Sequence, residues 1–599
     1  MLKYLTVACA LFGLLVAISL ESWLRKSIIR NENSADNYAT VRSRNSEFWS
    51  IQFLPLALML LVVGAAIGMG VAFLNAAVFL CGAILCLVSV GLGSRTVVTG
   101  SIAPSSLASE GDIRGSLRTA YRSGSVMGLS ISSLALIGLG LIFLLFSTKE
   151  IINLIASFGL GASVTSLCIG LSGTAYSGAY ALSVKSDDYT DYTGSFIGSG
   201  ADFVETYVLS VCAAALLAGV AVDTSGVTST FTMASAAKYP LIVFAIGIVA
   251  SVIGVFTYRG HVVKNPAAGI TAGNIVAAAV IAVAAILFSK SVLESYVYGI
   301  CVAAGMAALL ASAELSKTFS SDGISFKKHV PSARTVGASQ SMIYSLSIGM
   351  MSVIFPVAFT SVALIISYYF ANFYGMAMAA VGINSMAAVN SAVRGFSINT
   401  ASASEIVSVN ETDEEGPTPA DVLLTASVRT DVIGKTYSAV STAVTLVAMY
   451  CALSIVGSSE SANLLTTSAF FGMMLGAVSV FIAGGLIIRS IRQTSEVLRD
   501  KLDDIYNDEK NITFLRGLIP LYLLSILAPF AAGFFGRING LIAFACACTI
   551  TGMCVLFTFN NSGKYFDRMA TETIGTVLKI MVAFTLVFAP FFMNFGGVF

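Results

Sequence analysis

The sequence predicts an all-α, polytopic integral membrane protein. Of its 599 residues 56% are hydrophobic and 11% are charged, whereas a soluble domain carries about 25% charged residues. The mean hydropathy is +0.86. No segment shows the alternation of a membrane β-barrel. Since the backbone must satisfy its own hydrogen bonds inside a bilayer, such apolar segments are expected to be helices.

Sixteen apolar stretches are long enough to cross about 30 Å of hydrocarbon as helices. They lie at 1–20, 51–72, 74–94, 123–146, 151–183, 196–221, 239–257, 268–289, 291–312, 335–370, 373–393, 422–456, 463–488, 515–535, 538–559 and 570–597. The first has no cleavage site after it and is predicted to be a span. Several exceed 25 residues, so their helices should continue beyond the bilayer. No linker is long enough to separate domains, so 1–599 is expected to form a single membrane domain.

Lys and Arg gather in the connections that follow odd-numbered spans, and the positive-inside rule assigns those connections to the cytoplasm. Both termini should then face outside, and the loop with Asp187 should be cytoplasmic. The stretch from Arg492 to Lys510 combines helical spacing with mixed charge, which predicts a solvated cytoplasmic helix. The polar segments 96–118 and 394–420 are also expected on the cytoplasmic side, with an acidic surface loop near 405–415.

Charge and side-chain chemistry exclude several functions. The formal net charge is +1, so there is no basic field for nucleic acid. The ten cysteines are scattered, mostly through apolar spans, and their expected role is packing. The two histidines, His261 and His329, fall in short polar loops, which excludes a histidine-based metal centre.

The stretch 186–207, SDDYTDYTGSFIGSGADFVETY, places carboxylates at the mouth and in the interior of an apolar segment. Asp187 and Asp191 are four residues apart, and Asp202 and Glu205 are three apart, so each pair shares one helix face. An ionisable residue at bilayer depth costs roughly 2.5–3.5 kcal/mol and is a functional hypothesis by default. The alternative is that the pairs lie in water at a helix end.

Six motifs resemble those of the membrane-integral pyrophosphatases, and they follow the order of that family from residue 120 onward. They are AYRSGSVMG (120–128), GLGASVTSL (159–167), GSGADFVETY (198–207), FYGMAMAAVGINS (373–385), IGKTYSAVSTA (433–443) and TVLKIMVAFTLVFAP (576–590). The resemblance implies a sixteen-helix homodimeric pump that couples Mg-pyrophosphate hydrolysis to proton or sodium export. It also implies two concentric rings of helices, with spans 5, 6, 11, 12, 15 and 16 inside.

The hydrolytic motifs of that family survive only in part. The resemblance identifies Asp187, Asp191, Asp421, Lys435 and Asn560 as remnants of a metal and pyrophosphate site, with Asp187 and Asp191 as metal ligands. Other matched positions have lost the charged or amide residue of the family, namely Gly170, Gly178, Ala181, Lys185, Ser195, Arg394, Ala401, Ser402, Leu424 and Val428. Magnesium needs oxygen ligands, and phosphoryl transfer depends on positioning and electrostatics. We therefore expect hydrolysis to be lost, with Mg²⁺ a cofactor only where activity remains.

A second set of matched residues is complete. Asp202, Glu205 and Lys579 correspond to the residues that form the ion gate in the family. Lys579 lies inside an apolar run, where an unpaired charge would carry a heavy desolvation cost. A carboxylate pair from another span would compensate that cost. The alternative is a buried ion pair that only locks helices together.

Three functions remain open on the sequence. The first is a pyrophosphatase-like membrane protein that retains the ion gate and lacks hydrolysis. The second is an active pyrophosphate-energised proton or sodium pump with a rebuilt site. The third is a channel or transporter for another solute. The expected partners are membrane lipid and a second copy of the chain, with a heteromer as the alternative, and no nucleic acid.

Overall fold

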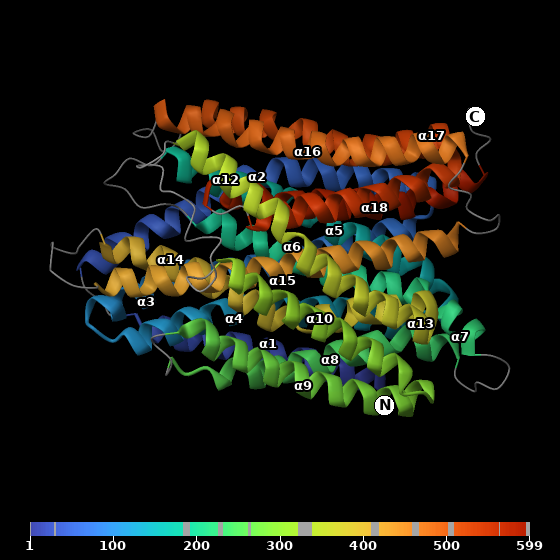
Figure 1. Cartoon of the computed structure of the whole chain (residues 1–599), viewed down its shortest axis with the longest axis horizontal. Helices are drawn as coiled ribbons and strands as arrows, with labels where there is room; N and C mark the ends of the chain where they lie inside the picture. Colours follow the sequence, from blue (N-terminus) through green and yellow to red (C-terminus); the bar gives the residue numbers. More distant parts are fainter. Residues whose placement is uncertain are drawn as a thin grey trace.

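The computed structural model describes residues 2–28, 32–183, 192–225, 232–260, 265–320, 338–408, 418–457, 466–500, 508–561 and 564–594. These residues contain long helices and no β-strand. The helices lie side by side along the long axis of the molecule (Figure 1). The prediction of an all-α polytopic membrane protein is confirmed.

The helices follow one another along the chain with short connections. They are α1 (Leu2–Lys26), α2 (Glu32–Gly70), α3 (Phe73–Ser109), α4 (Ile113–Leu145), α5 (Thr148–Ser183), α6 (Thr193–Leu216), α7 (Ala218–Ser225), α8 (Met233–Thr257), α9 (Pro266–Leu293), α10 (Val297–Ser320), α12 (Ala338–Ser352), α13 (Ile354–Ser385), α14 (Ala387–Ser408), α15 (Pro419–Val456), α16 (Thr467–Asp500), α17 (Asp508–Asn561) and α18 (Lys564–Asn594).

Fourteen helices within the described ranges are long and apolar enough to cross a membrane. Two of them contain a backbone break with positive φ, at Asn372 in α13 and at Arg537 in α17. In α13 a Cβ on Gly375 would collide with the carbonyl oxygen of Ser367. Residues eight apart in one straight helix are about 12 Å apart, so the chain reverses at this break. Dividing both helices would give fourteen plus two segments, but the count of sixteen stays a prediction.

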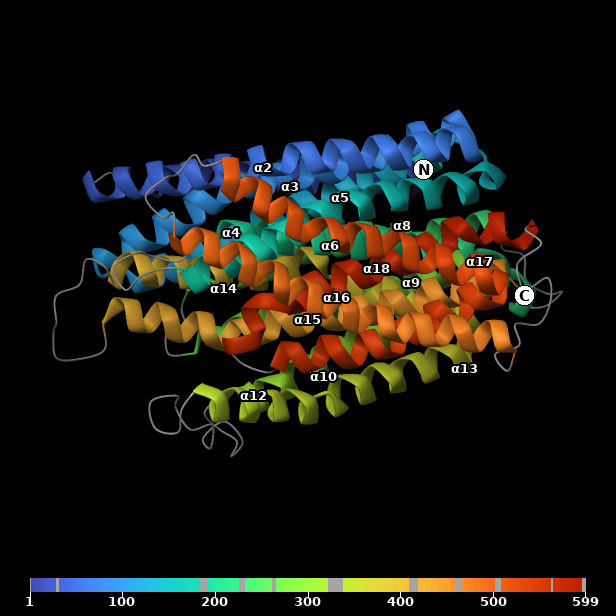
Figure 2. The same cartoon turned by 90° about the horizontal axis from the view of Figure 1, so that it is seen from above.

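The most buried helices form the centre of the bundle. In α5 and α6, 94% of the most hydrophobic segment is buried, against 28% in α1 and 22% in α2. Helices α6 and α18 contact each other, and both contact α5 and α15. Figures 1 and 2 both show α6 and α18 within the bundle, with other helices on either side. Helix α4 is also 78% buried, so the centre includes a helix outside the six predicted for the inner ring.

Two segments expected to be polar cytoplasmic connections are largely buried helix instead. Helix α3 continues to Ser109 and α14 to Ser408, and both pack against α4. A Cβ on Gly124 of α4 would lie 2.6 Å from the carbonyl oxygen of Ala392, so glycine lets α4 and α14 meet at backbone distance. The Ser and Thr side chains of these segments bond back to their own helices, as Thr400 Oγ1 does to the oxygen of Phe396. That bonding makes a polar sequence compatible with burial.

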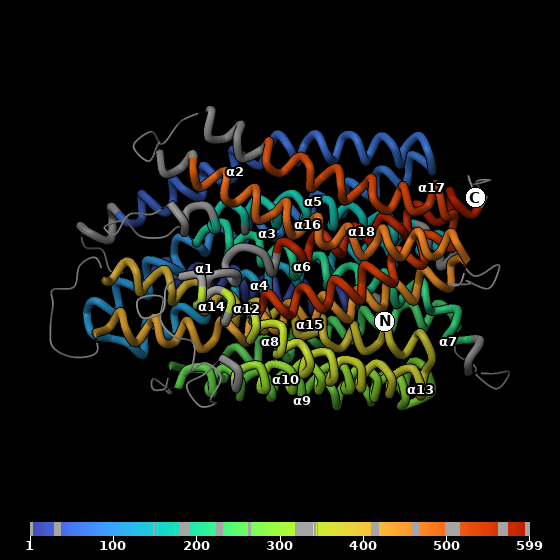
Figure 3. Tube along the Cα trace, turned by 45° about the horizontal axis from the view of Figure 1, so that its top comes forward, coloured from blue at the N-terminus to red at the C-terminus, as the bar shows by residue number. Residues whose placement is uncertain are grey.

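The stretch from Arg492 to Lys510 is not a separate helix. It forms the end of α16, to Asp500, and the start of α17, from Asp508, while 501–507 lie outside the described residues. The exposed pair Arg492–Glu496, at 3.0 Å, fits its expected solvation. The N- and C-termini of the described chain lie toward the same end of the bundle (Figure 3). Which side of the membrane that end faces stays a prediction.

Candidate functional site

Four central helices bring polar side chains together in the core. Helix α6 contributes Asp202 and Glu205, α18 contributes Lys579, α15 contributes Ser438 and α5 contributes Ser166. The two carboxylates are three residues apart and project from one face of α6 toward α18. Helix α6 is predominantly small and apolar around them, which allows close helix packing.

The Lys579 ammonium binds both carboxylates. Its Nζ lies 2.6 Å from Asp202 Oδ1 and 3.2 Å from Glu205 Oε2. It also donates to the backbone oxygen of Asp202 at 3.1 Å. All three residues are at most 1% exposed. An ammonium has three donors, and these three contacts use all of them. The distances confirm the expected proximity of Lys579 to the carboxylates of α6. We name Asp202, Glu205 and Lys579 the gate cluster.

Hydroxyl groups complete the surroundings of the gate cluster. Ser438 Oγ donates to Asp202 Oδ2 at 2.6 Å, and Thr576 Oγ1 lies 3.5 Å from Asp202 Oδ1. Ser166 Oγ lies 3.3 Å from Glu205 Oε2 and 2.8 Å from the backbone oxygen of Ala201. Since a hydroxyl has one proton, Ser166 divides its donation between two acceptors. The sequence did not single out these hydroxyls, because Ser and Thr are common in every span.

One carboxylate oxygen of the gate cluster is less engaged than the others. Glu205 Oε1 is buried and has no well-formed hydrogen bond among the described residues, and the same holds for Ser163 Oγ, although Ser163 interacts with the Glu205 carboxylate. Ser163 precedes Ser166 by three residues on α5 and therefore shares its face. With all groups ionised, two carboxylates and one ammonium leave a net charge of −1. A buried uncompensated negative charge is costly, and a proton or a small cation would remove that cost.

A second charged cluster lies further along α15. Asp431 accepts from Arg394 of α14 and from Lys435 one turn later on α15. Ser397 Oγ also donates to Asp431, at 3.2 Å. Arg394 and Lys435 are 5% and 4% exposed, while the Asp431 side chain is 24% exposed. The formal charge of these three groups is +1. We name Arg394, Asp431 and Lys435 the α15 cluster.

The structure places one of the remaining predicted site residues near Lys435 and another far from it. Asn560 Nδ2 donates to Thr436 Oγ1 at 3.3 Å, so Asn560 and Lys435 lie near each other on neighbouring helices. Asp421 instead forms a reciprocal capping box with Thr418 at the start of α15. It is exposed and 14 residues from Lys435, about 21 Å along the helix. Asp187 and Asp191 fall outside the described residues.

The described residues do not fit a magnesium site. Three or more Asp, Glu, His or Cys side chains never converge on one point within the described ranges. The carboxylate of the α15 cluster is occupied by two cationic side chains. Magnesium requires near-octahedral oxygen ligands, usually with one or two carboxylates per ion. Arg394 and Lys435 make the surroundings of Asp431 repulsive to a divalent cation.

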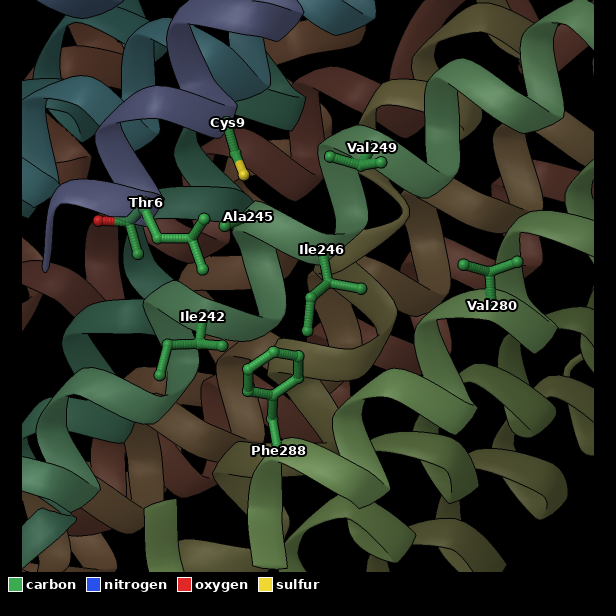
Figure 4. A pocket seen from close by; sticks show the side chains of 9 residues that line it. Thr6, Cys9, Ile242, Ala245, Ile246, Val249, Val280 and Phe288 are labelled. Carbon is green, nitrogen blue, oxygen red and sulfur yellow. The ribbon is translucent and has the colours of Figure 1, made fainter. Parts of the chain in front are cut away.

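A cavity of about 160 Å³ lies elsewhere, between α1, α8 and α9. Leu5 and Cys9 of α1, Ile242 and Ile246 of α8, and Phe288 of α9 line it, as Figure 4 shows in part. None of these helices carries a member of the gate cluster. The lining is apolar apart from a thiol and the hydroxyl of Thr6, so this cavity lacks the groups that would bind an ion.

The structure is thus a polytopic helical bundle with a lysine and two carboxylates buried in its core. The family model for the inorganic H+ pyrophosphatase matches residues 11–181 and 182–576. The chain therefore belongs to the membrane-integral pyrophosphatase family.

Curated relatives match nearly the whole chain at low identity. A Clostridium tetani protein named "Putative K(+)-stimulated pyrophosphate-energized sodium pump" is 22% identical over 99% of this chain and 98% of its own. A K(+)-insensitive pyrophosphate-energized proton pump 2 of Moorella thermoacetica is 23% identical over 94% of this chain and 90% of its own. A K(+)-insensitive pyrophosphate-energized proton pump of Methanosarcina mazei is 23% identical, with 92% and 89% covered.

Proposed function

We propose that this protein binds and passes a proton or sodium ion at the gate cluster and that it has lost pyrophosphate hydrolysis. The observation that carries the proposal is the fully buried set of Asp202, Glu205 and Lys579 with one unpaired carboxylate oxygen. Ion pumping by relatives, as their names state, supports the first half. The composition of the α15 cluster supports the second half.

The gate works through competition for carboxylates. Lys579 neutralises one of the two negative charges, so a single cation suffices to neutralise the other. Glu205 Oε1 is the acceptor without a well-formed hydrogen bond, and Ser163 of the neighbouring helix α5 is the hydroxyl that interacts with this carboxylate. A proton bound at Glu205 would weaken its attraction to Lys579 and leave the ammonium on Asp202, at 2.6 Å. Loss of the proton restores the contacts of Lys579 with both carboxylates. Occupancy of the site is therefore coupled to the contact between α6 and α18.

The charges beside the gate support the proposed loss of hydrolysis. Pyrophosphate hydrolysis would require several Mg²⁺ ions, each held by carboxylates. The α15 cluster offers one carboxylate and two cationic groups. Mg²⁺ would therefore be a cofactor of this protein only if hydrolytic activity survives.

We further propose a homodimer within a lipid bilayer, with both termini outside and the Asp187 loop and the Arg492–Lys510 stretch in the cytoplasm.

The competing function is an active pump with a rebuilt site. It is favoured by one finding, namely that the relatives named as pyrophosphate-energized pumps match 92% or more of this chain. Release of phosphate from Mg-pyrophosphate by detergent-purified protein separates the two. We expect no release, and calorimetry with a non-hydrolysable analogue should show no micromolar, Mg²⁺-dependent binding. Either activity or such binding would establish the rebuilt pump.

Replacing Glu205 by Gln tests the gate itself. Glu205→Gln keeps the shape and removes the charge, leaving Lys579 paired with Asp202 alone. We expect nearly unchanged folding and complete loss of ion flux or proton uptake in reconstituted vesicles. Ser479→Ala, a buried hydroxyl on α16 that bonds only its own helix, is the matched control for flux. Unchanged flux in Glu205→Gln would leave the cluster as a structural lock and would favour a different solute path.

A further inference from the structure

Four arginines gather at one end of α1, α4 and α8, on helices that carry no gate residue. Arg114, Arg118 and Arg122 recur every four residues on α4 and so share one face. Arg259 follows the end of α8. The next residue, Gly260, has φ +73°, and a Cβ there would collide with the carbonyl oxygen of Arg114. This close approach holds the end of α8 against the first turn of α4.

None of the four arginines has a carboxylate partner among the described residues. Arg118 and Arg122 lie over the same Trp23 ring, 5.7 and 4.5 Å from its centre, and a Cβ on Gly260, the neighbour of Arg259, would lie 3.4 Å from the Cβ of Arg118. The Nε atoms of Arg118 and Arg122 are buried and make no hydrogen bond within the described ranges. Two buried guanidinium N–H groups in a cluster of like charge are donors suited to an anionic oxygen.

Two acidic residues on the same helices, Glu21 and Asp112, are engaged elsewhere. Glu21 of α1 pairs with Arg25 at 2.6 Å. Asp112 caps α4 by accepting from the backbone N–H of Gly115 at 2.9 Å. Neither forms an ion pair with the arginine cluster, so its charge is not balanced by the described protein.

The same place has the features of a membrane–water boundary. The guanidinium of Arg122 lies 4.5 Å from the ring centre of Trp23 and 5.5 Å from that of Phe256. Phe256 is 42% exposed, and below it Ile253 of α8 and Ile18 of α1 are exposed as well. Aromatic side chains are typical of this boundary, and exposed aliphatic side chains beyond them are typical of a lipid-facing surface.

We propose that Arg118, Arg122 and Arg259 bind the phosphate of an anionic phospholipid, with its acyl chains on the apolar surface of α1 and α8. Guanidinium groups bind phosphate oxygens in pairs, with stronger hydrogen bonds than neutral donors make. Basic sites between transmembrane helices at the membrane boundary are suited to anionic headgroups. The exposed apolar side chains of α1 and α8, Ile18, Ile253 and Phe256, favour a lipid over a soluble phosphate.

The test uses the full-length protein in nanodiscs and in detergent. Native mass spectrometry should show phosphatidylglycerol retained over phosphatidylcholine by the unmodified protein. Removing a charged hydrogen-bond donor should weaken retention about 10- to 100-fold in Arg118→Gln and Arg122→Gln. Arg259→Gln is the safeguard against misfolding, because Arg259 is exposed and its loss should weaken retention without affecting the fold. Arg122→Lys should keep part of the retention.

Two controls decide between sources of the phosphate. Arg492→Gln removes an exposed arginine that is paired on α16 and should leave lipid retention unchanged. Inorganic phosphate at millimolar concentration should not displace phosphatidylglycerol. Displacement by phosphate alone would make this a soluble-anion site and overturn the proposal. Equal retention of the two lipids, or unchanged retention in Arg259→Gln and Arg122→Gln, would also overturn it.

Discussion

The two charged clusters in the core have opposite compositions. The gate cluster has two carboxylates and one ammonium, is at most 1% exposed, and has an unpaired oxygen. The α15 cluster has one carboxylate and two cationic groups, and its Asp431 side chain is 24% exposed. They lie close together, because Asp431 and Ser438 are seven residues apart on α15, about 10 Å. The gate cluster can therefore attract a cation, whereas the α15 cluster repels one.

This contrast is what the proposed function requires, namely an ion site in a core that holds no magnesium site. Formal charges of −1 and +1 on neighbouring clusters cancel, so the core as a whole carries no net charge from these six groups. Each cluster also lowers the cost of the other by Coulomb attraction in a medium of low dielectric.

The largest expected effect is on the gate cluster. Lys579→Ala removes the only cation that binds Asp202 and Glu205 in the described core, leaving two buried carboxylates near each other. Breaking a buried pair typically costs about 3–5 kcal/mol. The free energy of unfolding should fall by that amount, measured as a large drop in melting temperature in detergent. At low pH both carboxylates of this variant would be protonated, so the loss of stability should be smaller.

Lys290→Ala is the matched control for Lys579. The Lys290 ammonium is exposed and donates to the backbone oxygen of Glu294 at 2.9 Å near the end of α9. Its removal should change stability by at most about 0.5 kcal/mol. Equal melting temperatures for the two variants would contradict the assignment of Lys579 to a buried ion pair.

An intermediate effect is expected in the α15 cluster. Asp431→Asn keeps the side-chain volume and removes the carboxylate that binds both Arg394 and Lys435. Water reaches Asp431, so the loss should be smaller than at Lys579, roughly 1–3 kcal/mol. Glu496→Gln, in an exposed pair with Arg492, should cost at most about 0.5 kcal/mol. A loss at Asp431 equal to that at Lys579 would remove the distinction between the two clusters.

Most of the fold was predictable because hydropathy and length determine which segments are helices. The reversal of the chain at Asn372 was also visible as a boundary between two predicted spans. The burial of 394–408 was not predictable, because Ser and Thr bonds within α14 satisfy its polar side chains and only the structure shows them. Helix α4 was likewise missed as a central helix, since its burial depends on its neighbours.

The gate residues were predicted because charge in an apolar run is rare and demands a partner. The Asp431–Lys435 pair had a local signal, four-residue spacing on a helix, that could have identified it. The contact from Arg394 had no such signal, because it joins two helices distant in sequence. The capping box at Thr418 and Asp421 was also visible, as Thr-Pro-Ala-Asp at the start of a helical pattern.

The smallest expected effect concerns Asp421, where resemblance and geometry give different roles. Thr418 Oγ1 accepts from the Asp421 N–H at 3.3 Å, and Asp421 Oδ2 accepts from the Thr418 N–H at 3.2 Å. Asp421→Ala and Thr418→Ala should each lower stability by about 1 kcal/mol, the typical cost of losing a cap. The two losses should not add, because either substitution breaks the same reciprocal pair. Mg²⁺ should leave both melting temperatures unchanged. If Mg²⁺ instead stabilised the unmodified protein and Asp421→Ala alone abolished that stabilisation, Asp421 would be a metal ligand and its role as a cap would be secondary.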